Sequence, residues 1–136
     1  MEIIIALLSV LSLIIVISLH EFFHALVADK LGDPTPRSYG RLTLNPLAHI
    51  DPVGTLLLPL LGVLSGFPVI GWAKPTPIDP YNFRNPRRDE TLVALAGPLS
   101  NFLLALILSL FKSSFATYVG NMSLFLGIFN LLPVPP

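Results

Sequence analysis

Four long apolar runs, separated by polar segments, dominate the pattern of residues along the chain. They cover about residues 3–28, 53–73, 91–111 and 115–132. A helix needs roughly 20 apolar residues to cross about 30 Å of hydrocarbon, and each run approaches this length. The pattern therefore predicts an all-α polytopic membrane protein with three to four membrane segments. We expect residues 1–136 to form a single membrane-embedded core.

The second run differs from the others because prolines and glycines interrupt it. Pro52, Pro59 and Pro68 are spread along it with four glycines, and both residue types weaken a continuous helix. Seven of the eight bases lie in the polar segments 29–51 and 74–90 that flank it. If the run re-enters, the positive-inside rule places all seven bases on the cytoplasmic face. We favour a re-entrant segment, with a complete span as the alternative.

Composition narrows the possible classes of protein. Hydrophobic residues make up 53% of the chain, charged residues 12%, and the mean hydropathy is +0.76, which is typical of a membrane protein. The net charge is zero and no basic tract exceeds two residues, so nothing indicates a nucleic-acid partner. The chain has no cysteine, so a metal must be held by His, Asp or Glu.

His20, Glu21 and His24 form an H-E-x-x-H motif in the first apolar run. On a helix, histidines four residues apart project from one face and can share one zinc ion, and Glu21 is placed to take a proton from water that the metal activates. Ionisable groups on an apolar helix persist when they are paired, bound to metal or beside a polar cavity. The alternative is that these groups lie at the membrane interface, beyond the end of the helix.

Further motifs occur along almost the whole chain, in residues 31–34, 40–46, 49–55, 71–75, 96–101 and 129–136. With the H-E-x-x-H motif, their order resembles the site-2 protease family, which consists of intramembrane zinc metalloproteases, in its compact prokaryotic form. The resemblance implies Zn²⁺ as the cofactor, held by His20 and His24, with Glu21 as the catalytic residue. It also implies a third zinc ligand, an aspartate directly beyond Pro136, so we expect the sequence to be a truncated form of the enzyme.

The resemblance implies roles for two asparagines in the later runs. Asn130 is expected near the metal, where its amide orients substrate or donates to the developing oxyanion, and Asn101 is expected to line or brace the same cavity. For both, the alternative is a hydrogen bond that holds two helices together. Substitute metal ligands are conceivable at Asp33, His49 or Asp51, but their loop positions favour capping or turn roles.

A short alternating pattern over residues 39–44 predicts a small β element at the membrane face. A protease that cuts inside a membrane must unwind its substrate, and a strand edge can capture the extended form by β-augmentation. An ordinary surface hairpin is the alternative.

The function implied is zinc-dependent cleavage of membrane-spanning segments of other proteins, in a prokaryotic cytoplasmic membrane. The partners expected are therefore a transmembrane protein substrate and the lipid bilayer. Two other functions stay open. One is a catalytically inactive relative that binds membrane helices, and the other is a metal carrier in which His20 and His24 form a transit site.

Overall fold

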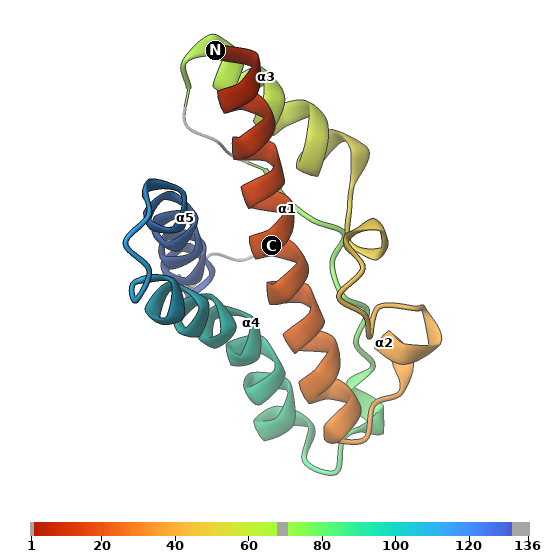
Figure 1. Cartoon of the computed structure of the whole chain (residues 1–136). Helices are drawn as coiled ribbons and strands as arrows, with labels where there is room; N and C mark the ends of the chain where they lie inside the picture. Colours follow the sequence, from red (N-terminus) through yellow and green to blue (C-terminus); the bar gives the residue numbers. More distant parts are fainter. Residues whose placement is uncertain (1, 68–70, 132–136) are drawn as a thin grey trace.

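The computed structural model describes residues 2–67 and 71–131, and all regular secondary structure within them is helical (Figure 1). Among the described residues, two helices are long and apolar enough to cross a membrane, namely α1 and α4. The elements, in chain order, are α1 (Glu2–Lys30), α2 (Thr35–Ser38), η1 (Pro46–Ala48), η2 (Pro52–Leu57), α3 (Leu58–Ser65), η3 (Pro80–Asn82), α4 (Pro86–Leu108) and α5 (Ser114–Leu131).

Helices α1, α4 and α5 pack together through small residues. Within α1, the buried face includes Ala25 and Ala28, whereas large apolar side chains such as Ile4 and Leu7 remain exposed. Between α4 and α5, a Cβ atom added at Gly127 would meet the ring of Phe102, so the glycine permits a close helix approach. The buried faces of the long helices thus include many small residues, whereas many bulky apolar side chains face outward.

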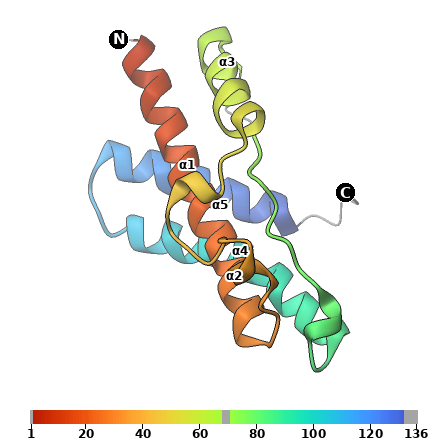
Figure 2. The same ribbon diagram turned by 90° about the vertical axis from the view of Figure 1, so that its right-hand side faces the viewer.

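The second apolar run folds back on itself. Helices η2 and α3 together cover residues 52–65, which is shorter than a membrane span needs. The backbone N–H of Trp72 donates to the carbonyl of Gly54 at 3.0 Å, and the hydroxyl of Thr55 donates to the carbonyl of Trp72 at 2.6 Å. Both ends of the run are therefore side by side, and Figure 2 shows α3 beside the first half of α1.

The small β element predicted over residues 39–44 is not found, because the described residues contain no strand. Local hydrogen bonds hold this segment in turns instead. Gly40 has a φ of +73°, and the N–H of Arg41 donates to the carbonyl of Pro36. The N–H of Asn45 donates to the hydroxyl of Thr43, so side chains compete with strand pairing for the backbone groups.

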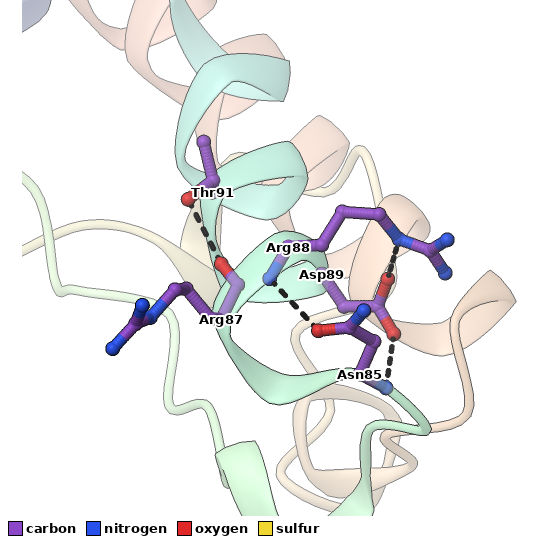
Figure 3. A network of polar contacts seen from close by, with 5 residues as sticks. All are labelled: Asn85, Arg87, Arg88, Asp89 and Thr91. Carbon is purple, nitrogen blue, oxygen red and sulfur yellow. Dashed lines mark hydrogen bonds and ion pairs between the residues drawn. The ribbon is translucent and has the colours of Figure 1, made fainter.

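A polar network fixes the first turn of α4, close to the end of α1 (Figure 3). The side chain of Asn85 caps the helix by accepting from the N–H of Arg88 at 3.3 Å. The buried carboxylate of Asp89 accepts from the N–H of Asn85 at 3.2 Å and from Nε of Arg88 at 3.0 Å. This network anchors the end of α4 from which the helix runs past the histidines of α1.

Candidate functional site

The two histidines of the H-E-x-x-H motif lie inside α1, one turn apart, on the face that packs against α4. His20 is 8% exposed and His24 is partly buried. Their Nε2 atoms are 3.0 Å apart. Since α1 continues to Lys30, the motif lies within the helix and not beyond its end.

Residues of α4 fix the tautomer of both rings. Nδ1 of His24 lies 2.6 Å from the carbonyl oxygen of Val93, and Nδ1 of His20 lies 2.5 Å from Oδ1 of Asn101. A carbonyl oxygen only accepts hydrogen bonds, so each Nδ1 carries the proton and donates. Each Nε2 is therefore left with a free lone pair.

Asn101 holds its orientation through α5. It is completely buried, and its Nδ2 donates to the hydroxyl of Ser123 at 3.4 Å. The same hydroxyl donates its proton to the backbone carbonyl of Asn101 at 2.7 Å. The hydroxyl oxygen of Ser123 is therefore free to accept from Nδ2. The amide oxygen therefore faces His20, and the hydrogen bonds of Asn101 link α1, α4 and α5.

This arrangement fits a metal ion. Two lone pairs that face each other at 3.0 Å need a positive charge between them, either a proton or a metal ion, and neutral imidazoles whose Nδ1 atoms donate to a carbonyl oxygen are typical zinc ligands. Space for the ion depends on Gly97 of α4, because a Cβ atom there would clash with the Nε2 atoms of both histidines. Ligand atoms of His20, Glu21 and His24 all lie within 4.8 Å of one another.

Glu21 is held by a residue that sequence reasoning missed. The hydroxyl of Thr76 donates to Oε2 of Glu21 at 2.6 Å. Thr76 stands between Pro75 and Pro77 in an extended segment, and prolines on both sides favour such a backbone. The sequence carried this local signal, but nothing in it indicated that the segment would pass Glu21, 55 residues earlier.

A cavity of about 310 Å³ opens beside these side chains. Asn130 lines it from α5, and its Nδ2 donates to the carbonyl of Leu126 at 2.7 Å. Glu90 of α4, which the sequence did not single out, also lines it. The cavity residues are His20, Glu21, His24, Pro75, Thr76, Ile78, Glu90, Val93, Ala94 and Asn130.

Each of the three candidate substitute ligands is held by hydrogen bonds to nearby backbone or side chains. Asp51 caps η2, and the N–H groups of Gly54 and Val53 lower the pKa of its carboxyl. His49 is buried, and its Nε2 lies 2.8 Å from the carbonyl oxygen of Thr43.

Asp33 is completely buried just after α1 and binds three donors. Burial favours its neutral form, but hydrogen bonds from Thr35, the N–H of Asp79 and the side chain of Asn82 outweigh this and lower its pKa. The aspartate expected beyond Pro136 as a third ligand lies outside the described residues.

Comparison with known proteins identifies relatives over most of the chain. A Bacillus subtilis protein named "Putative zinc metalloprotease YwhC" is 39% identical over 93% of this chain. These relatives support the resemblance of the chain to the site-2 protease family. Two further relatives, both named "Putative zinc metalloprotease Rip2", come from Mycolicibacterium smegmatis and Mycobacterium tuberculosis and are 34% and 35% identical over 86% of the chain.

The chain spans 63% of the length of the Bacillus relative and 48% of each mycobacterial relative. No family model matches it, and no solved structure matches it.

Proposed function

We propose that this chain is the catalytic core of an intramembrane zinc-dependent endopeptidase that cleaves membrane-spanning segments of other proteins. One observation carries the proposal: two Nε2 lone pairs converge beside the carboxylate of Glu21, within a helix long enough to cross a membrane. The names of the relatives, which describe zinc metalloproteases, support the same activity.

His20 and His24 would hold the zinc through their Nε2 atoms. When bound, zinc polarises the scissile carbonyl and lowers the pKa of water towards about 7. A catalytic zinc usually has three protein ligands, and we propose an aspartate, as the family resemblance implies, for the third.

Glu21 would act as the general base and then as the general acid. Its carboxylate accepts the proton of the attacking water and delivers it to the leaving amine, a role that typically contributes about 10²–10⁴-fold to the rate. The hydroxyl of Thr76 restrains Oε2 of Glu21, which leaves the other carboxylate oxygen available for this transfer.

We assign Asn130 to the substrate. It lines the cavity at the end of α5, and its amide can exchange the carbonyl of Leu126 for a substrate carbonyl or the developing oxyanion. Asn101 acts through His20, because its oxygen is occupied by the ring Nδ1.

The membrane setting completes the proposal. We propose a multi-pass protein of the cell membrane in which α1, α4 and α5 cross the bilayer and the segment 52–73 re-enters. The apolar length of α1 and α4 supports this, as do the seven bases gathered in the flanking loops. The cavity would then lie toward the cytoplasmic side, where the loops begin.

Replacement of Glu21 tests the proposal. The full-length protein and its Glu21→Gln variant are purified in detergent, and zinc content and cleavage of a single-span reporter protein are measured. We expect both proteins to retain about one zinc per chain, while the variant loses at least ~100-fold in cleavage rate. Asp29→Asn, at an ion pair with Arg37 on the surface, is the matched control and should cleave normally.

Reporter binding and zinc flux, measured with the same two proteins, distinguish the other two functions. A relative that only binds membrane helices would capture the reporter without cutting it, in both the parent and the Glu21→Gln protein. A metal carrier would move zinc across sealed vesicles, and that flux would survive Glu21→Gln. Either result would overturn the protease proposal.

A further inference from the structure

One face of α4 is directed at the metal site. Glu90, Ala94, Gly97 and Asn101 stand at positions i, i+4, i+7 and i+11, so they form a single stripe along the helix. Gly97 abuts the Nε2 atoms of both histidines, and Asn101 accepts from His20. Glu90 begins the stripe, about 10 Å along the helix axis from Gly97 at 1.5 Å per residue.

Glu90 lies at the rim of the catalytic cavity and its charge is not neutralised there. It lines the cavity with His20 and His24, yet it is exposed. Within the described part of the chain, the ion pairs use Asp29 and Asp89, and Glu90 takes part in neither. Its neighbour Asp89 differs, because the Asp89 carboxylate accepts from Nε of Arg88 and from the backbone N–H of Asn85 (Figure 3).

The walls of the cavity are suited to a long aliphatic side chain. Pro75, Ile78, Val93 and Ala94 supply apolar surface, and the described cavity residues include no lysine or arginine. A side chain with an apolar stem and a cationic tip can bury its stem against such walls and place its charge on a carboxylate at the rim. Glu90 provides that carboxylate.

Substrates of the proposed reaction carry such side chains in the right region. Membrane-spanning segments have an excess of Lys and Arg where they leave the bilayer on the cytoplasmic side. The basic loops of this chain place its cavity mouth on that side as well, so a rim carboxylate would meet a basic residue of the substrate.

We propose that Glu90 is a specificity-determining residue that binds a Lys or Arg side chain of the substrate close to the scissile bond. This inference rests on the proposed function and names the substrate class of the same site. A neutral residue at that substrate position loses the ion pair, and an acidic residue is repelled by Glu90.

Charge exchange between enzyme and substrate tests the inference. The probes are single-span reporter proteins that carry Lys, Gln or Glu at each position within a few residues of the bond cut, as mapped by mass spectrometry. Cleavage of each reporter is measured as kcat/KM with the full-length parent, Glu90→Gln and Glu90→Lys proteins. Binding of the same reporters is measured by fluorescence anisotropy on the Glu21→Gln background, in which hydrolysis is blocked.

We expect the parent to prefer Lys over Glu by about tenfold at one position, in cleavage and in binding. Glu90→Gln should reduce this preference to about twofold, and Glu90→Lys should reverse it. Asp29→Lys, which makes the same change of charge outside the cavity, should leave the preference as in the parent. Thermal unfolding of each variant checks that the fold is retained.

The two proposals fail in different ways. If the parent cleaves all reporters equally, or if its preference for Lys survives Glu90→Lys, the role of Glu90 is overturned and the protease assignment stands. If no reporter is cleaved but binding favours Lys through Glu90, the specificity site stands and the protease assignment falls. If neither cleavage nor binding depends on the reporter charge, the inference about Glu90 is overturned.

Discussion

The orientation of each histidine depends on a residue of α4 that is not itself a metal ligand. Val93 offers a backbone carbonyl to His24, and Asn101 offers its amide oxygen to His20. Such partners typically change metal affinity by 10–100-fold, because they fix the tautomer and direction of the ligand. Single substitutions on α4 should therefore alter metal binding as strongly as changes near the motif itself.

Gly97→Ala is the sharpest of these substitutions. Alanine favours helices, so in an open helix it would stabilise by roughly 1 kcal/mol, but here its Cβ clashes with both Nε2 atoms. We expect zinc affinity to fall roughly 10- to 100-fold, as measured by competition with a chromophoric chelator. Gly120→Ala on α5 is the control, since its nearest contact is an ordinary 3.6 Å to Cβ of Leu108. Unchanged affinity in Gly97→Ala would contradict this geometry of the site.

Thr76 should affect catalysis more than metal binding. Thr76→Val keeps the shape of the side chain but removes the hydroxyl that donates to Glu21, so the carboxylate loses its restraint. We expect kcat on the reporter to fall roughly tenfold with little change in KM or zinc content, and Thr76→Ser to restore it. Thr91→Val is a matched control, because that hydroxyl donates to Arg87 within α4 (Figure 3). A Thr76→Val enzyme of normal kcat would exclude the positioning role.

At the scale of elements, Asp33 ties the end of α1 to η3, just before α4 begins. The N–H of Asp79 and the side chain of Asn82 donate to its carboxylate at 2.8 and 2.9 Å. Removal of the carboxylate breaks both hydrogen bonds, each of which contributes about 0.5–1.5 kcal/mol to stability. Asp33 therefore helps to set α1 and α4 at the spacing that the site needs.

The lowered pKa of Asp33 predicts a pH dependence of stability. A carboxyl whose pKa is lower in the folded state stabilises the protein above its ordinary pKa of about 3.9, and this contribution is lost as the pH falls through the lowered value. Thermal unfolding in detergent should show a parent Tm that falls below about pH 4. In Asp33→Asn the Tm should be lower at neutral pH and should fall less on acidification. Parallel curves for the two proteins would show that Asp33 does not contribute.

The apolar runs predict the long helices, whereas the residues at which these helices begin and end depend on local caps and prolines. The third run was expected over residues 91–111, but α4 begins at Pro86, because Asn85 caps it and proline suits the first turn. A hydropathy pattern omits the charged residues at the start of α4, which include Glu90. The predicted strand at residues 39–44 failed because side chains in that segment satisfy the backbone locally.

The site was predictable only as far as it is local in sequence. His20, Glu21 and His24 are one helical turn, so their spacing alone brought them together. Their partners are far along the chain: Val93 is 69 residues from His24, and Thr76 is 55 residues from Glu21. A backbone carbonyl such as that of Val93 carries no signal in the sequence, because every residue has one.

At the scale of the whole molecule, the outer surface is what a bilayer requires. Large apolar side chains are exposed along α1, α4 and α5, far beyond the small apolar patches of a soluble monomer. The polar groups lie elsewhere, in the site between α1 and α4 and in the loops that follow α1 and precede α4. The segment 52–73 lies between these two loops, and its ends are joined by the hydrogen bond from Trp72 to Gly54.

The hydrogen bond from Trp72 to Gly54 supports a re-entrant segment, and a re-entrant segment predicts the topology of the chain. If the segment re-enters, Ser38 and Tyr81 lie on the same side of the membrane and Ser113, after α4, lies on the other. The chain has no cysteine, so Ser38→Cys, Tyr81→Cys and Ser113→Cys each introduce one reactive thiol into it. In right-side-out vesicles, a membrane-impermeant maleimide should label Ser113→Cys at once and the other two only after permeabilisation, because their loops carry the bases held on the cytoplasmic side. Labelling of Ser38→Cys and Tyr81→Cys from opposite sides would mean that the segment spans the bilayer, and the cavity would then open between two faces.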